Sequence, residues 1–147
     1  MTEPAPPRVA YWHVWADPQG ISRQSRREMV RFELHSIQPP AMPQWLGAKA
    51  SGTAFVTVLP VGWVGDWHEN PKPQWIIPLS GRWFVVTMDG QRVEMGPGDI
   101  SLGEDQGTKP ISGRQGHMSG TVGDEPAVLM VVQLEAPWAS GGPGATS

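Results

Sequence analysis

The chain has 147 residues and a formal net charge of -3 at pH 7, with 11 basic and 14 acidic side chains. This length suits a single domain with one core, and the absence of a basic block argues against a nucleic-acid partner. The chain contains no cysteine, so disulfides and thiolate chemistry are excluded, and a metal would have to bind histidine, carboxylate or amide groups.

The composition also bears on secondary structure and location. Eighteen glycines and sixteen prolines indicate many turns and few long helices. No apolar run approaches the roughly 20 residues that a membrane-spanning helix needs. The N-terminal residues lack the basic and then apolar pattern of a signal peptide. We therefore expect a cytoplasmic protein without a membrane partner.

In chain order, the pattern predicts short strands separated by turns. We expect a flexible lead over 1–8, a β-barrel domain over 9–135 and a disordered tail over 136–147. Within the domain, strands are predicted at 9–15, 29–35, 53–59, 74–78, 83–88, 91–94, 100–102 and 127–134, a helical turn at 22–28, and loops at 38–51, 103–116 and 121–126. The Asp89-Gly90 turn should pair 84–87 with 91–94. Such frequent turns are typical of an all-β sandwich or small barrel.

One stretch combines polar groups at strand-compatible spacing with a glycine at each end. It contains Gly62, His68, Asn70, Gln74 and Gly81. His68 and Asn70 lie two residues apart and would share one face of an extended segment. Prolines 71 and 73 keep the following residues extended, which should direct His68, Asn70 and Gln74 into a common interior.

The spacing of these residues resembles the first motif of the cupin superfamily, G-x5-H-x-H-x3,4-E-x6-G. A second cupin motif is matched more loosely by the turn at 96–99 and by His117, with a longer connecting loop. The resemblance covers residues 52–135. It implies a single-domain jelly-roll barrel (a double-stranded β-helix) that binds a small molecule, often as a homodimer and often with one divalent metal. In a homodimer, the aromatic strand 9–15 could pair across a two-fold axis.

Carried over by position, the resemblance implies His68, Asn70, Gln74 and His117 as metal ligands. Asn70 replaces a histidine and Gln74 replaces a glutamate, so the donor set contains no carboxylate that could compensate a divalent charge. Two alternatives follow. One divalent Fe, Mn, Ni or Zn ion is held by His68, Gln74 and His117, or the cavity is metal-free and His68 or His117 acts as a general base.

Charged residues in the loop before His117 are further candidates. Glu104 or Asp105 could orient an imidazole or transfer a proton if the loop folds over the barrel mouth, and otherwise they are solvated acids. Lys109 and Arg114 could similarly bind an anionic group or remain solvated. The remaining histidines, His13 and His35, are expected to be half-buried or exposed without a catalytic role.

Four of the eight tryptophans fall between positions 63 and 83, around His68. Indole rings either fill the core or line an aromatic cavity. Counting with period two from Gln74, Ile76 points inward and Trp75 outward. We therefore expect Trp63, Trp83 and Ile76 to be cavity walls that, with Asn70 and Gln74, contact the ligand.

These patterns leave three functions open. The first is an enzyme that transfers protons on an apolar or aromatic metabolite, as a lyase, dehydratase or isomerase does. His68 or His117 would be its base, assisted by Glu104 or Asp105. The second is a metal-dependent, dioxygenase-like cupin that uses His68, Gln74 and His117. The third is a metabolite-binding cupin without catalysis.

Overall fold

The computed structural model describes residues 5–138, and all eleven of its regular elements are strands. They are β1 (Val9–Ala16), β2 (Ser22–Met29), β3 (Glu33–His35), β4 (Gln44–Leu46), β5 (Gly52–Leu59), β6 (Gln74–Ser80), β7 (Arg82–Thr87), β8 (Arg92–Met95), β9 (Ser101–Glu104), β10 (His117–Val122) and β11 (Ala127–Leu134). The expected all-β fold is therefore confirmed.

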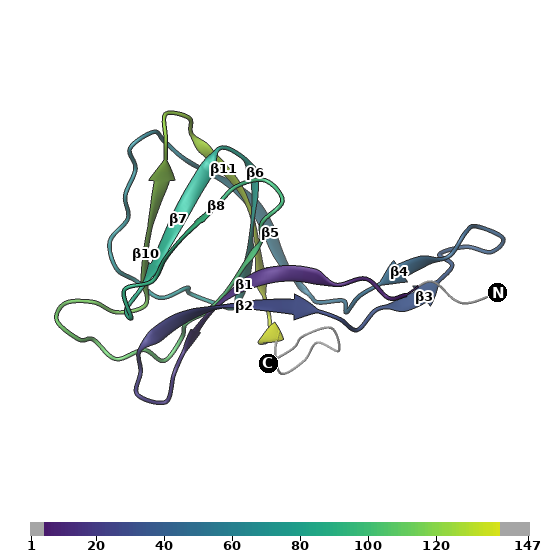
Figure 1. Cartoon of the computed structure of the whole chain (residues 1–147), viewed down its shortest axis with the longest axis horizontal. Coiled ribbons are helices and arrows are strands. Elements are labelled where there is room, and N and C mark those ends of the chain that lie inside the picture. Colours follow the sequence, from purple (N-terminus) through teal and green to yellow (C-terminus); the bar gives the residue numbers. More distant parts are fainter. Residues whose placement is uncertain (1–4, 139–147) are drawn as a thin grey trace.

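Two sheets form the barrel (Figure 1). The larger has the strand order β2-β1-β9-β6-β11-β5, and the smaller has the order β10-β7-β8. The segment before β6 extends the smaller sheet, because Val64 and His68 form single bridges to Gly120 and His117 of β10. The motif segment thus lies against the strand that begins with His117.

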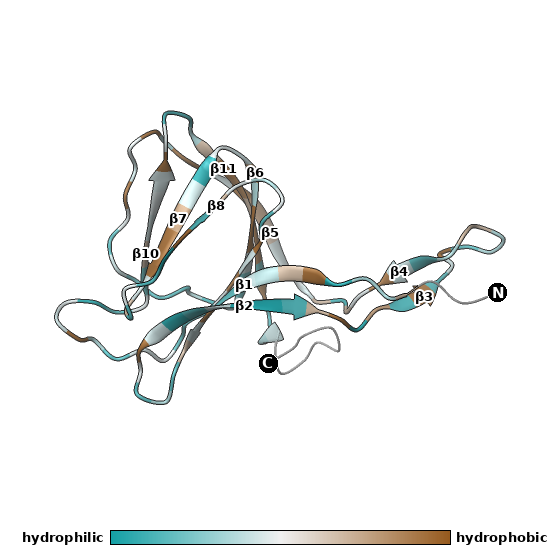
Figure 2. Ribbon diagram, viewed as in Figure 1, coloured by the Kyte–Doolittle hydropathy of each residue, from teal (hydrophilic) through white to brown (hydrophobic). Residues whose placement is uncertain are grey.

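The core lies between these sheets. It is built from inward-facing residues of β6, β7, β8 and β11, with Val14 of β1, and its most buried members include Met95 (0% exposed) and Trp83 (2%). Figure 2 shows the corresponding apolar stretches along β7 and the hydrophilic character of β2 at the edge of the larger sheet. Burial of one face of each sheet explains the period-two pattern of the sequence.

A second apolar cluster covers part of the outer face of the larger sheet. The Trp75 ring packs edge-on against Tyr11 and against Trp138, with 5.3 Å between ring centroids in both pairs. Leu102 and Leu134 complete the cluster. Trp75 therefore points outward, as the period-two count predicts. Trp138 falls in the stretch expected to be a disordered tail, yet it is buried; residues 139–147, like 1–4, lie outside the described range.

Two predictions for the N-terminal third are wrong. The segment 22–28, expected to be a helical turn, is strand β2, because its residues pair along the whole of β1. This pairing leaves β1 between β2 and β9, so β1 has no free edge with which to pair across a two-fold axis. Tertiary pairing has overridden the local helical preference of this arginine-rich segment.

A further difference between the prediction and the structure concerns residues 30–50. The expected half-buried strand 29–35 and loop 38–51 instead form an exposed arm, in which short strands β3 and β4 pair with each other and extend from the barrel (Figure 1). Within residues 5–138, no helix is long and apolar enough to cross a lipid bilayer.

Candidate active site

A cavity of about 240 Å³ opens between the two sheets. Strands β5, β6, β10 and β11 contribute Thr57, Ile76, His117 and Val131 to its wall, and the segment before β6 contributes His68. Asn70 and Gln74 also line it. The residues of both motifs are therefore gathered around one space.

His117 forms a buried pair with Asp105. The Nδ1 atom of His117 lies 2.6 Å from Oδ2 of Asp105, and the two residues are 5% and 0% exposed. An ionised carboxylate can only accept a hydrogen bond, so Nδ1 carries the proton and Nε2 keeps its lone pair. His117 lines the cavity, which makes Nε2 the nitrogen available to a bound molecule.

The surroundings of Asp105 keep it ionised. Burial alone would raise the pKa of this carboxyl, but hydrogen bonds from His117 and Asn70 and the charge interaction with His117 outweigh burial, so its pKa lies below the usual value of 3.8. Asp105 therefore retains its negative charge at neutral pH. This charge would stabilise a proton taken up by His117.

A chain of side-chain amides leads from β11 to Asp105. Gln133 donates to Oε1 of Gln74 (3.2 Å), Gln74 donates to Oδ1 of Asn70 (2.6 Å), and Asn70 donates through Nδ2 to Oδ1 of Asp105 (2.8 Å). Every donor points towards the carboxylate, so the bonds reinforce one another. The replacements at the family's ligand positions, Asn70 and Gln74, thus hold Asp105.

His68 lies at the exposed mouth of the cavity. Its Nδ1 is 2.8 Å from the carbonyl oxygen of Asp66, which can only accept, so Nε2 of His68 is also unprotonated in the neutral ring. The rings of His68 and His117 are 4.8 Å apart between centroids, and their backbones exchange two hydrogen bonds of 2.9 Å. The two imidazoles are therefore neighbours at different depths.

Two glycines permit this close assembly. A Cβ atom on Gly103 would lie 2.3 Å from Nδ2 of Asn70, so only glycine leaves room for that amide beside β9. Gly116 has a φ of 71°, and a Cβ there would lie 2.2 Å from the carbonyl oxygen of His68. Both positions depend on tertiary contacts, which the sequence pattern does not reveal.

The loop between β9 and β10 is held by Glu69. Its Oε2 accepts hydrogen bonds from both the backbone nitrogen (2.8 Å) and the hydroxyl of Thr108, and the Thr108 hydroxyl in turn accepts one from the backbone nitrogen of Gly116 (3.0 Å). The sequence reasoning missed Glu69 and Gln133 as parts of the site. The position of Glu69 between His68 and Asn70 was the available signal.

Of the two acids proposed beside His117, the structure brings only Asp105 to it. Glu104 is the last residue of β9 and points to the outer face, where it accepts from Nε2 of His13 (2.7 Å) and from the backbone nitrogen of Trp138 (2.8 Å). Arg27 donates to Nδ1 of His13 (2.9 Å). The alternation of strand residues separates Glu104 from Asp105, so we assign Glu104 a structural role.

The structure places the three residues proposed as cavity walls at the cavity. Trp63, Trp83 and Ile76 all line it, Trp63 at the exposed rim and the other two inside. The indole nitrogen of Trp83 is buried without a hydrogen-bond partner. Trp67 lies apart from the cavity lining and stacks under the guanidinium of Arg114, 5.4 Å from its ring centroid.

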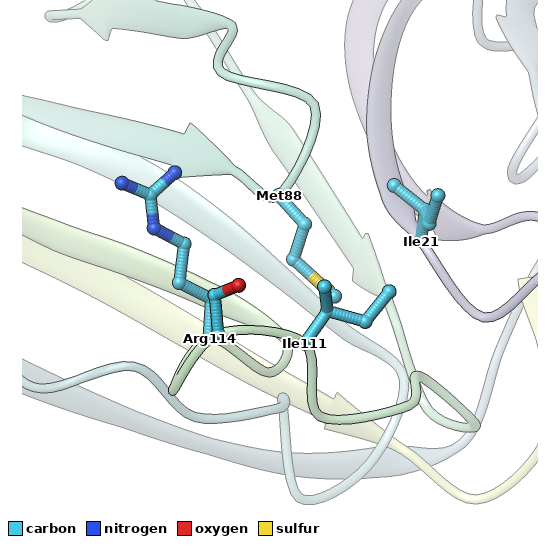
Figure 3. A pocket seen from close by; sticks show the side chains of 5 residues that line it. Ile21, Met88, Ile111 and Arg114 are labelled. Atoms are coloured by element: carbon cyan, nitrogen blue, oxygen red, sulfur yellow. The ribbon is translucent and has the colours of Figure 1, made fainter.

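A second hollow of about 380 Å³ lies outside the barrel interior (Figure 3). It is lined by Ile21, Met88, Ile111, Ser112 and Arg114, which come from two turns and from the loop before β10. These side chains include no general base. Arg114 lines this second hollow and is absent from the lining of the cavity that contains His117.

The donor set does not fit the four-ligand metal site that the family motif implies. Among residues 5–138, no three histidine, aspartate or glutamate side chains gather closely enough to hold a metal ion. The oxygens of Asn70 and Gln74 already accept hydrogen bonds within the amide chain. Only His68 and His117 offer strong donor nitrogens, and two imidazoles without a carboxylate bind a divalent cation weakly.

A comparison with models of known protein families shows to which family the chain belongs. The model described as "Cupin domain" matches residues 55–133, more than half of the chain. The chain belongs to the cupin family. The match begins in β5 and ends in β11, so this cupin domain contains the cavity, the amide chain and the His117–Asp105 pair. A search of the curated proteins found no match.

Proposed function

We propose that this cupin is a proton-transfer enzyme, of the lyase, dehydratase or isomerase type, that acts on a small apolar or aromatic molecule. The single observation that supports this proposal is the buried hydrogen bond between His117 and the ionised Asp105 at the wall of a cavity lined by both apolar and polar side chains. In such a pair the carboxylate fixes the tautomer of the imidazole and stabilises its protonated form.

In the proposed reaction, Nε2 of His117 removes a proton from a carbon or oxygen of the substrate. Asp105 holds the resulting imidazolium through Nδ1. The amide chain keeps Asp105 in place, and Ile76 and Trp83 provide apolar walls beside the reacting centre. His68, at the mouth, is close enough to exchange a proton with the same substrate.

The proposal can be tested before the natural substrate is known. Carbonyl compounds such as acetophenone, phenylacetone and phenylacetaldehyde exchange their α-protons in D₂O when a base removes them, and proton NMR measures the rate. We expect the protein to accelerate exchange for at least one of these probes. His117→Gln should lower the acceleration by about 10²–10⁴-fold, the usual contribution of a general base. A chelator should have no effect.

The other two functions predict different results. Stoichiometric metal in the purified protein, lost in both His68→Ala and His117→Ala, would overturn the proposal in favour of a metal-dependent cupin, for which the free Nε2 atoms of both histidines would be ligands. Binding of the probes without any exchange would overturn it in favour of a metabolite-binding cupin.

A further inference from the structure

The indole N–H of Trp83 is a buried donor that no described residue satisfies. Trp83 is 2% exposed, and its Nε1 atom has no hydrogen-bond partner within residues 5–138. Two other buried side-chain atoms of the described chain share this condition, Oε1 of Gln24 and Nε1 of Trp138, and neither residue lines the cavity. A buried indole N–H usually has an acceptor, because an unmade hydrogen bond costs free energy. At the cavity wall, a bound molecule can supply that acceptor.

Trp83 also borders a small recess that adjoins the cavity. The recess has a volume of about 10 Å³, and Trp83, His117, Asn70 and Ile76 line both the recess and the cavity. Such a volume suits about one oxygen atom or water molecule. The unsatisfied donor and the base of the proposed reaction therefore belong to residues that surround the same oxygen-sized space.

The fold fixes the position of Trp83 before any ligand binds. Trp83 lies on β7, the central strand of the smaller sheet, where it pairs with Met95 on one side and Thr121 on the other. Its ring packs in the main core cluster, which also contains Ile76 and Val85. A hydrogen bond made in such apolar surroundings is stronger than one in water, and a donor held in place needs no reorganisation during the reaction.

We propose that Trp83 donates its indole N–H to a carbonyl oxygen of the substrate, and that the substrate is a carbonyl compound with a C–H bond next to that group. This inference rests on the proposed function, in which Nε2 of His117 removes the proton. As the C–H bond breaks, its electron pair moves towards the carbonyl group and negative charge develops on the oxygen. A donor at this oxygen stabilises the charged form more than the neutral carbonyl, which accelerates proton removal.

Binding of two matched probes tests the hydrogen bond without any turnover. Acetophenone carries a carbonyl oxygen where α-methylstyrene carries a methylene group, and the two molecules are otherwise alike. In ¹H–¹⁵N NMR titrations of the wild type, acetophenone should bind at least about tenfold more tightly, the discrimination that one buried hydrogen bond provides. Acetophenone alone should move the indole N–H signal of Trp83 downfield. Equal affinities for the two probes, or no binding of acetophenone, would overturn the inference.

Variants assign the preference to Trp83. Trp83→Phe identifies the indole signal and should abolish the preference for acetophenone. Trp75→Phe is the matched control, because it makes the same substitution at a buried tryptophan of the outer cluster, and it should leave the preference unchanged. A preference that survives in Trp83→Phe would overturn the inference.

The α-proton exchange assay separates this inference from the proposed function. Trp83→Phe should lower kcat for exchange by about 10²–10³-fold with a smaller change in KM, because the donor acts mainly on the charge that develops during the reaction. Exchange that falls in His117→Gln but keeps the wild-type rate in Trp83→Phe would overturn the role of Trp83 and leave the proposed function intact. A carbonyl preference that depends on Trp83, without any exchange, would overturn the proposed function and support the carbonyl site.

Discussion

Asn70 donates two hydrogen bonds to one oxygen of Asp105, from its backbone nitrogen (2.9 Å) and from its side-chain Nδ2 (2.8 Å). The other oxygen of Asp105 accepts the hydrogen bond of His117. The residue at a usual histidine position of the cupin motif therefore no longer offers a ligand to a metal. It holds the carboxylate that orients the remaining histidine.

Replacement of Asp105 by asparagine should damage both stability and activity. Asp105 accepts three hydrogen bonds on two oxygens, and asparagine offers only one acceptor oxygen, so the amide group would face either His117 or Asn70. We expect Asp105→Asn to lower the free energy of unfolding by about 2 kcal/mol in urea denaturation. The α-proton exchange rate should fall as well. Equal activity in this variant would contradict the role given to Asp105.

The contribution of Asp105 to stability should depend on pH. Its pKa in the folded protein lies below 3.8, so between the two pKa values the unfolded chain binds more protons than the folded one. The difference in unfolding free energy between wild type and Asp105→Asn should be constant above about pH 4 and should shrink as the pH falls further. Asp124→Asn, in an exposed turn, is the control. A difference that grows on acidification would contradict the assignment.

Gly103→Ala should disturb the site without touching a polar group. Its Cβ would meet the Asn70 amide at 2.3 Å, and the amide has no free space because it is bonded to Gln74 and Asp105. Overpacking of this kind costs about 1–3 kcal/mol, measured by thermal or urea denaturation. Gly47→Ala, in the exposed arm, should cost less because its nearest neighbour is the Phe32 ring. Equal losses in both variants would argue against a tight fit at Gly103.

Restoration of the missing carboxylate should create metal affinity. In Gln74→Glu, the new carboxylate lies in the cavity with His68 and His117 and supplies the charge that the present donors lack. We expect Ni²⁺ to raise the melting temperature of Gln74→Glu and to leave that of the wild type within error. Gln19→Glu, in an exposed turn outside the cavity lining, is the control. A large Ni²⁺ shift in the wild type would favour the metal-dependent alternative.

The local sequence pattern was sufficient to predict the barrel and the site residues His68, Asn70, Gln74 and His117. The spacing from Gly62 to Gly81 predicted the cupin fold, and alternation from Gln74 placed Ile76 inside and Trp75 outside, because strand geometry fixes which face a residue shares. The same count could not show that Glu104 and Asp105 face different sides of the sheet. The alternation holds only as far as β9 extends, and the sequence does not show where this strand ends. Glu69, Gly103 and Gln133 were missed because their roles arise from contacts between distant segments.

The protonation state of His117 is the most direct test of this account. Long-range ¹H–¹⁵N NMR spectra distinguish a protonated Nδ1 from a protonated Nε2 in each neutral imidazole, and His117→Gln identifies the signal. We predict that Nδ1 of His117 carries the proton in the wild type at neutral pH, and that this preference weakens in Asp105→Asn. A proton on Nε2 in the wild type would contradict the proposal that His117 presents a base to the cavity.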